Sequence, residues 1–417
     1  MNAPFQNTDA RTAVAGAECA VRVLRSLAEV EAAETMWTAL EDRAQGATLF
    51  QSFAWCRTAA EHMARRGTTA LYIVCVTMRD EAVAILPLAI QRKGIRTILT
   101  GLSEPFQQYT DMLAAPGHSP ASLFALMRDT IVKSGADYVH FGQVRADSAL
   151  YQALGTAIPP CGEDDAAPCI TLTDWPDYET YLKSIKSKTR KNMRNARNKL
   201  ERTGAIEHQA GSDPDLLCGV ISRTYEGRVD WLERMGLTSR AFRNAGFKAF
   251  VDRFKAPGST GIETVAMSLT LDGKPIAEQW GFVHKGRYYA FISNWDDTYA
   301  ESSPGRLHLG EVIRSCYESG VTSVDFIIPA APYKLTWAPN TVPVQDHVWP
   351  LTVIGYIYYS IWLQRLRPFA KSCVESLPPA LRQKVIGAVL SGGDEASVSK
   401  RTVDGQAKGH SVQDALS

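Results

Sequence analysis

The sequence predicts an α/β (α+β) protein with two similar domains in tandem, each a mixed sheet flanked by helices, and a C-terminal helical extension. The chain has 417 residues, which is more than one hydrophobic core usually supports. Strand-like and helix-like segments alternate along its first part, as they do in layered α/β folds. After a stretch of proline, glycine and acidic residues at 159–168, the same alternation starts again.

In the first half, the apolar pattern predicts strands and helices in turn. Short apolar runs indicate strands at residues 21–24, 70–76, 82–90 and 138–141. Longer segments with helical spacing indicate helices at residues 28–44, 53–65 and 119–133. The turn Arg79-Asp80-Glu81 is expected to pair the second of these strands with the third.

In the second half, the pattern predicts a meander of antiparallel strands between helices. The strands are expected at residues 169–172, 263–271, 276–284, 287–293 and 323–328. The helices are expected at residues 178–202, within 214–254, and at 307–319. The dipeptides Asp272-Gly273 and Lys285-Gly286 are typical of tight hairpin turns and join the three meander strands.

These patterns divide the chain into six segments. We expect a disordered arm at 1–19, a first domain at 20–158, a linker at 159–168, a second domain at 169–340, a helical extension at 341–390 and a disordered tail at 391–417. Within the extension, residues 356–371 form an aromatic helix that also carries arginine and lysine. Such a helix suits a membrane-interface anchor, but we favour a helix that closes over the second domain.

Composition excludes several classes of protein. The chain has 45 basic and 44 acidic residues, so no overall field attracts nucleic acid or an anionic membrane. Its eight cysteines are scattered without a C-x-x-C pair, which favours reduced thiols and no metal site. We see neither a signal peptide nor an apolar run of membrane-spanning length, and we therefore expect a cytoplasmic protein.

The segment from Ser303 to Leu307 is the most informative in the chain. Ser303, Pro304, Gly305, Arg306 and Leu307 open a predicted helix. A small-residue loop at a helix N-terminus leaves backbone N–H groups free, and the helix dipole favours an anion there. The arginine could add a charge-assisted contact. The segment is either a phosphate cradle or a plain helix cap.

A longer string of motifs resembles a known family. Gly273-Lys274-Pro275-Ile276-Ala277, Tyr288-Tyr289, Trp295-Asp296, Ser303-Pro304-Gly305, Asp325-Phe326 and Tyr333-Lys334 follow in one order at compatible spacings. This resembles the FemAB/CelD-like branch of the GNAT acyltransferases, over about residues 20 to 370. The resemblance implies two GNAT folds in tandem, an acyl-CoA co-substrate and a link to exopolysaccharide or cellulose biosynthesis.

The resemblance also implies roles near the reacting carbonyl. Lys334 stands where Fem-type transferases place a lysine, and its ammonium would stabilise the oxyanion of the tetrahedral intermediate. Tyr333 beside it is expected to bind the acceptor. One departure concerns residues 327–332, where many members have a glycine soon after the Asp-Phe pair and this chain has Ile-Ile-Pro-Ala-Ala-Pro. We therefore expect a stiffer loop before Lys334.

Acyl transfer to an amine needs a base that delivers the nucleophile neutral. The candidates are Glu278, on a strand of the meander, and Asp296, before the phosphate loop. Burial would raise the pKa of a glutamate into a useful range, although Glu278 could equally be a strand-surface acid. Asp325 and His308 are weaker candidates, and we favour structural roles for both.

The predicted helix from Tyr181 to Arg202 carries nine basic residues against the single acid Glu201. Repulsion between like charges one turn apart destabilises a helix unless anions bind. The anion could be the 3′-phosphate of CoA, a nucleotide-sugar or lipid-diphosphate carrier, or an acidic glycan. Because Fem-type relatives hold a carrier-linked sugar between their domains, Arg190 and Arg194 are expected to bind acceptor phosphate. A solvated amphipathic helix is the alternative.

In the first domain, residues 106–111 resemble the family motif that ends in Tyr-x-Asp and faces the inter-domain cleft. Tyr109 and Asp111 would then contact sugar hydroxyls or the acceptor amine. A turn with a capping aspartate is an equal alternative.

The favoured function is N- or O-acyl transfer from acetyl-CoA or another acyl-CoA to an amino sugar or glycan precursor. The reaction would take place in the cytoplasm or at the inner face of the membrane, in contact with polysaccharide-synthesis machinery. One alternative is a Fem-type transferase that uses aminoacyl-tRNA, disfavoured because no long helical arm is inserted in the second domain. The other is a non-catalytic ligand-binding or scaffold subunit. No DNA partner is expected.

Overall fold

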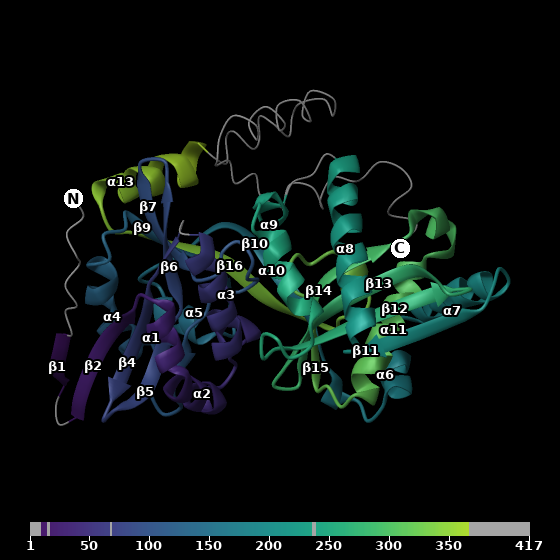
Figure 1. Cartoon of the computed structure of the whole chain (residues 1–417), viewed down its shortest axis with the longest axis horizontal. Helices are drawn as coiled ribbons and strands as arrows, with labels where there is room; N and C mark the ends of the chain where they lie inside the picture. The colour runs from purple at the N-terminus through teal and green to yellow at the C-terminus, as the bar shows by residue number, and fades with distance from the viewer. Residues whose placement is uncertain (1–9, 15–16, 67–68, 236–238, 367–417) are drawn as a thin grey trace. The chain divides into compact units, whose positions relative to one another are not determined.

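A computed structural model describes residues 10–14, 17–66, 69–235 and 239–366 of the chain. It divides into two compact units, each described here by itself (Figure 1). The first unit combines the described residues up to Asp164 with those from Val344 onward, and the second runs from Asp165 to Pro343. The tail predicted at 391–417 and the second half of the predicted extension lie outside the described residues.

Two sheets organise the first unit. The first sheet has the strand order β1-β2-β4-β5-β8, with bounds Ala10–Val14, Ala17–Leu24, Ile73–Met78, Glu81–Leu86 and Leu113–Ala114. The strands of the second follow the order β16-β9-β7-β6-β3, with bounds Asn340–Pro350, Tyr138–Arg145, Arg96–Gly101, Leu88–Lys93 and Thr69–Leu71. Among the described strand pairs of this unit, β7 and β9 are parallel and the others antiparallel.

The helices of the first unit follow the apolar periodicity. They are α1 Leu27–Ala32, α2 Glu34–Arg43, α3 Phe53–Arg66, α4 Pro120–Val132, α5 Ala149–Leu154, α13 Val353–Ile357 and the π-helix η5 Tyr358–Leu366. A capping box between Ser26 and Glu29 starts α1. The single helix predicted at 28–44 is wrong, because the chain interrupts it at Ala33.

Three predicted segment assignments are also wrong. Residues 159–168 were expected as a linker but form most of strand β10, Pro160–Thr171. Residues 341–350, expected in a helical extension, belong to strand β16. Residues 10–14 and 17–19, expected in a disordered arm, belong to β1 and β2. For β2, β10 and β16, a partner strand distant in the sequence supplies backbone hydrogen bonds, which local composition cannot indicate, whereas β1 pairs with its sequence neighbour β2.

The second unit is built on one mixed sheet. Its strands follow the order β11-β12-β13-β14-β15-β10, with bounds Ile206–Gly211, Glu263–Leu271, Lys274–His284, Arg287–Trp295, Ser323–Asp325 and Pro160–Thr171. The predicted meander is confirmed. At each of the two hairpins, Asp272-Gly273 and Lys285-Gly286, both turn residues have positive φ, as a type I′ turn requires.

The helices of the second unit are α6 Tyr178–Ser184, α7 Ser187–Glu201, α8 Pro214–Arg234, α9 Arg240–Arg243, α10 Phe247–Val251, η3 Asp252–Lys255, η4 Asp297–Ser302, α11 Pro304–Glu318 and α12 Pro332–Leu335. The long helix predicted at 178–202 is two helices, because Ile185 and Lys186 have extended backbone.

Helices α8 and α11 cover opposite faces of this sheet. On β13, Glu278 is hydrogen-bonded to Arg223 of α8, whereas its neighbour Ala277 packs with Leu307 of α11. Successive residues of a strand point to opposite faces, so each helix has a face of its own. Each face of the meander is therefore covered by one main helix.

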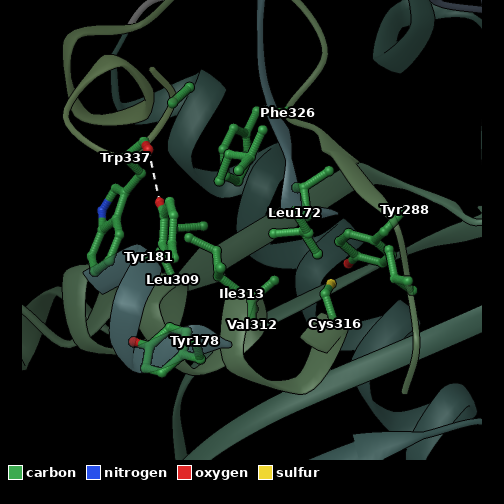
Figure 2. Packing of buried hydrophobic residues seen from close by; sticks show 14 of the residues in the cluster. Leu172, Tyr178, Tyr181, Tyr288, Leu309, Val312, Ile313, Cys316, Phe326 and Trp337 are labelled. Atoms are coloured by element: carbon green, nitrogen blue, oxygen red, sulfur yellow. Dashed lines mark hydrogen bonds between the residues drawn. The ribbon is translucent and has the colours of Figure 1, made fainter. Parts of the chain in front are cut away.

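One hydrophobic cluster fixes α11 against the sheet (Figure 2). Val312 and Ile313 of α11 pack with Tyr288 of β14 and with Tyr181 of α6. The hydroxyl of Tyr181 donates a hydrogen bond of 2.8 Å to the carbonyl oxygen of Trp337. Because this core holds the middle of α11, it also sets where the N-terminus of the helix points.

Candidate active site

Strands β14 and β15 separate after a short ladder. Their parallel pairing joins Arg287–Tyr289 of β14 to Ser323–Asp325 of β15. Strand β14 then continues to Trp295, paired with β13 on its other side. Within the described residues, no strand pairs with the β15-facing edge of β14 beyond Tyr289. This edge offers backbone N–H and C=O groups to a ligand that contains amides.

A β-bulge lies where the two strands separate. Trp280 pairs with Ile292 and Gly281 pairs with Ala290, so Phe291 is an extra residue on β14. A bulge bends its strand and increases the local twist. A Cβ atom added to Gly281 would lie 2.0 Å from the carbonyl oxygen of Tyr289, so only glycine fits the sheet here. The bulge therefore turns β14 away just as its pairing with β15 ends.

The N-terminus of α11 follows this strand after the short helix η4. Ser303 adopts the left-handed conformation, with φ 49° and ψ 53°, and Pro304 occupies the first turn of the helix. The backbone N–H groups of Arg306 and Leu307 both donate to the carbonyl oxygen of Ser303, at 3.1 and 3.4 Å. Of the N–H groups expected to form a phosphate cradle, only that of Gly305 has no hydrogen-bond acceptor among the described residues. Fewer backbone N–H groups are therefore available to bind phosphate than the sequence indicated.

Arg306 adds a positive charge to this helix end. Its side chain is buried, and burial lowers the pKa of the guanidinium below its usual value. Among the described residues, no acidic partner is recorded for it. A buried guanidinium without a carboxylate, at a helix N-terminus, favours a bound anion.

Gly305 packs beside Trp295 without strain. A Cβ atom added to Gly305 would lie 3.5 Å from Cδ1 of Trp295, which is an ordinary van der Waals contact. Packing within the protein therefore does not require glycine at this position. A large side chain here would fill the space in front of the helix.

Glu278 is held in an ion pair that the sequence did not indicate. Arg223 of α8 donates to both carboxylate oxygens, with Nε to Oε2 at 2.9 Å and Nη2 to Oε1 at 2.6 Å. Ser268 donates to Oε1 at 3.1 Å, and Glu278 is 6% exposed. The side chain of Arg223 is 49% exposed. In this geometry Glu278 orients Arg223 and is already saturated with donors, which makes it a poor free base.

Asp296 caps the helix that precedes the phosphate loop. Its carboxylate accepts from the backbone N–H and hydroxyl of Thr298 and from the ammonium of Lys274. Burial alone would raise the pKa of Asp296, but these donors outweigh it and the pKa is lowered. A carboxylate with a lowered pKa is a weak base, so the geometry favours a structural role for Asp296 over the predicted catalytic one.

Lys334 holds the loop between β15 and α12. Its ammonium donates to the carbonyl oxygens of Ile327 and Pro329, each at 3.1 Å. The carboxylate of Asp325 accepts from the backbone N–H of Ile327 at 2.8 Å, and Ile327 has a φ of 50°. A β-branched residue rarely adopts this conformation, so the loop is tightly constrained. Tyr333, next to Lys334, is half-buried against the core around Trp337.

His308 is a buried neutral side chain. Neither of its ring nitrogens has a hydrogen-bond partner within the described part of the chain, and its ring lies 5.6 Å from that of His208. Burial lowers the pKa of His308 to about 3, and of His208 to about 4. These histidines favour packing over proton transfer, as the sequence suggested for His308.

The two arginines expected to bind acceptor phosphate differ in the structure. Nη1 of Arg190 donates to the carbonyl oxygens of Lys183 and Ile185, both at 2.6 Å, and so joins α6 to α7. Arg194 is exposed, and no hydrogen bond or ion pair is recorded for it among the described residues. Only Arg194 is presented to solvent as the prediction requires.

Tyr109 and Asp111 belong to the core of the first unit. Tyr109 is fully buried, and the guanidinium of Arg145 lies over its ring. Oδ1 of Asp111 accepts from the backbone N–H groups of Met112 and Leu150, at 2.7 and 2.8 Å. Burial raises the pKa of Asp111 to about 7. The structure thus supports the capping alternative over sugar contacts for this pair.

The structure therefore groups the candidates in the second unit by face. Ser303 to Leu307 and the β14 edge lie at the α11 end, whereas Glu278 faces α8. The bulge, Gly281 and Arg223 were missed by the sequence analysis. A glycine flanked by Trp280 and Phe282 in a strand was the available signal, since such a glycine often marks a bulge or a close backbone approach.

Comparison with known proteins bears on this arrangement. Residues 187–335 match the model of the acetyltransferase (GNAT) domain family. The match covers about a third of the chain and lies within the second unit. The match begins at α7 and ends at α12, so it includes the bulge, the separated strands and the N-terminus of α11.

Two solved structures are similar to this chain, and FemX is the one whose similarity supports the fold. The crystal structure of FemX matches with a TM-score of 0.56 at 10% sequence identity, over 79% of this chain and 98% of FemX. A tandem GNAT protein from the clavulanic acid biosynthesis pathway matches with a TM-score of 0.44 at 13% identity, over 79% of this chain and 98% of that protein. The fold is that of two GNAT-like domains in tandem, as the sequence predicted. No curated protein matches the sequence significantly.

The described residues include neither a membrane-spanning helix nor a cluster of metal-ligating side chains. None of their helices is long and apolar enough to cross a membrane. They contain no group of three or more histidine, cysteine, aspartate or glutamate side chains that could hold a metal ion.

Proposed function

We propose that the protein is an acyltransferase that takes an acyl group, most simply acetyl, from acyl-CoA and transfers it to an amine. The observation that carries this proposal is the separation of β14 from β15 beside the N-terminus of α11. An extended amide-containing chain fits the free edge of β14, and a diphosphate fits the helix end with Arg306. CoA contains both groups: its pantetheine arm carries the amides, and its diphosphate follows that arm.

In this proposal, residues of the chain divide the work of binding and catalysis. Backbone N–H groups of β14 beyond Tyr289 would contact the pantetheine amides and the thioester carbonyl, where negative charge grows during aminolysis. Gly305 and Arg306 would hold the diphosphate. Lys334 would act by fixing the loop at Ile327 and Pro329. Glu278 would act through Arg223, whose guanidinium it orients.

The acceptor is proposed to be an amino sugar or a glycan precursor of exopolysaccharide or cell-envelope biosynthesis. The exposed cations of α7, Arg194 among them, suit an acceptor that carries phosphate or another anionic group. Transfer to nitrogen is favoured over oxygen because an amine, once neutral, attacks a thioester without a strong base. A carrier-linked acceptor would bring the protein into contact with polysaccharide-synthesis machinery.

Calorimetric titration with acetyl-CoA tests the donor. We expect micromolar binding by the wild-type protein, abolished by Gly305→Trp and weakened about 100-fold by Arg306→Glu, since a charge-assisted contact becomes repulsive. Gly305→Ala is the matched control, because its Cβ atom meets only an ordinary contact, and it should preserve the fold. Failure to bind acetyl-CoA or any longer acyl-CoA would contradict the proposal.

A second donor, aminoacyl-tRNA, is favoured by one specific observation. Lys186, Lys188, Lys191, Arg194 and Arg202 are exposed along α7 and its ends, and no acidic partner is recorded for them among the described residues. This donor would be favoured if the protein bound aminoacyl-tRNA with an affinity that falls steeply with salt and did not bind acyl-CoA. Binding of acyl-CoA without turnover on any amine would instead favour a non-catalytic ligand-binding subunit.

A further inference from the structure

The first unit exposes a cluster of apolar side chains at one end. We call it the α13 patch; its members are Ile95, Val353, Ile354, Tyr356, Ile357 and Ile361. Four of them are more than half exposed, with Ile95 at 88%, Val353 at 75%, Tyr356 at 62% and Ile357 at 54%. Exposed apolar residues normally occur singly, so a cluster of this kind marks an interaction surface.

Packing fixes the helical part of the patch to the sheet. A Cβ atom on Gly355 would lie 2.0 Å from the carbonyl oxygen of Asp137, so α13 approaches the start of β9 as closely as backbone allows. The hydroxyl of Thr352 donates to the carboxylate of Asp137 at 2.8 Å. Tyr358 stacks on Tyr138 with ring centroids 4.7 Å apart. The exposed side chains therefore belong to a helix that is held against the start of β9.

The hairpin between β6 and β7 joins the patch through Arg96. Its guanidinium lies 4.3 Å from the centroid of the Tyr358 ring. Ile95, at the tip of the same hairpin, is one residue away and almost fully exposed. Figure 1 shows β7 and α13 side by side at this end of the unit. Two segments more than 250 residues apart in sequence thus build one surface.

The charged side chains on the two segments of the patch are all cationic, and the nearby carboxylate of Asp137 is buried. Residues 88–101 contain Arg92, Lys93 and Arg96, residues 351–366 contain Arg365, and neither segment contains an acidic residue. A second copy of the chain docking face to face would bring these like charges together, which disfavours a symmetric dimer. The surface of an anionic lipid bilayer complements the cations with its phosphates and the apolar side chains with its headgroup region.

We infer that the α13 patch binds the surface of an anionic lipid bilayer, with the apolar side chains in the headgroup region and the cations at the lipid phosphates. Helix α13 with η5 would lie in the plane of the interface, since none of the described helices can span a membrane. The tyrosine at position 356 suits this depth, because aromatic side chains with a polar tip prefer the interface.

Co-sedimentation of the full chain with vesicles tests the inference. We expect binding to vesicles of phosphatidylcholine with phosphatidylglycerol, weaker binding to phosphatidylcholine alone, and weaker binding as salt is added. The double variant Val353→Asp with Ile357→Asp should lose at least about tenfold in affinity, because two charges enter the apolar face. Arg365→Glu should reduce binding to the anionic vesicles alone.

Val132→Asp is the matched control, because Val132 of α4 is also an exposed apolar residue but belongs to neither segment of the patch. It should bind vesicles as the wild type does, and circular dichroism should show all variants folded. Three results would overturn the inference: no binding by the wild type, equal binding by the double variant, or a wild-type dimer that the double variant converts to a monomer.

Discussion

Gly281 and Tyr289 face each other across β13 and β14 at a distance that leaves no room for a side chain on the glycine. An added Cβ atom would lie 2.0 Å from the Tyr289 carbonyl oxygen. The contact lies at the bulge where β14 stops pairing with β15. A single glycine thus permits the bend that frees the strand edge on which the proposed acyl-donor site depends.

Gly281→Ala should destabilise the second unit and weaken acyl-CoA binding. Relief of the contact requires β13 and β14 to shift, which costs about 2–3 kcal/mol. Chemical denaturation measures the free energy of unfolding, and calorimetry measures the affinity for acetyl-CoA. Gly305→Ala is the comparison, because its Cβ atom makes an ordinary contact. Equal stability of the two variants would show that the bulge does not depend on glycine.

Loss of Arg223 should cost more than loss of the Glu278 charge. Arg223→Ala leaves a buried carboxylate with Ser268 as its remaining donor among those described here, at a cost of about 3 kcal/mol. Glu278→Gln leaves a half-exposed guanidinium that water can solvate, and should cost about 1 kcal/mol. Denaturation of both single variants and the double variant gives the coupling energy.

If Glu278→Gln destabilised the protein more than Arg223→Ala, the expectation that an unpaired buried carboxylate dominates the energy of this pair would be wrong.

Asp111 should make the first unit less stable as the pH rises. Burial raises its pKa from 3.8 to about 7, so the folded protein retains a proton that the unfolded chain releases. The stabilisation is fully present below pH 3.8 and is lost as the pH rises through about 7. The shift corresponds to about 4 kcal/mol over that range.

Asp111→Asn keeps the acceptor oxygen for Met112 and Leu150 but cannot ionise. The free energy of unfolding of this variant should lack the decline that the wild type shows between pH 4 and 7, and Asp111→Ala should be destabilised throughout. Parallel pH profiles of wild type and Asp111→Asn would mean that the carboxyl is not the group responsible.

Lys334→Met should loosen the loop from Ile327 to Pro329. The variant loses two hydrogen bonds to carbonyl oxygens, and we expect about 1–2 kcal/mol of destabilisation. Hydrogen exchange of the backbone amides in this loop should become faster. Lys334→Arg, which retains the donors, is the control. A variant with unchanged stability and exchange but a much lower kcat would restore the predicted oxyanion role for this lysine.

Several features could be predicted because they depend on local sequence. Asp272-Gly273 and Lys285-Gly286 supply the positive φ angles of type I′ turns, so the meander could be placed strand by strand. Ser303 and Pro304 mark the start of α11 within three residues of its predicted first residue, since Pro fits the first helical turn. The tandem α/β organisation followed from length and alternation.

Other features depended on contacts between distant residues. Residues 159–168 look like a linker by composition, yet become part of β10 because other strands supply partners for their backbone groups. Glu278 looked like a base until Arg223, 55 residues away, was found to occupy both of its oxygens.

The sequence by itself therefore determined the turns, the helix starts and the GNAT-like order of elements, because each of these is set by the conformational preferences of a few adjacent residues. The tertiary structure alone decided which side chains are free to act. Whether Lys334, Asp296 or Arg190 binds a substrate or a group of its own chain depends on which groups the fold brings within hydrogen-bond distance, and no local pattern encodes that.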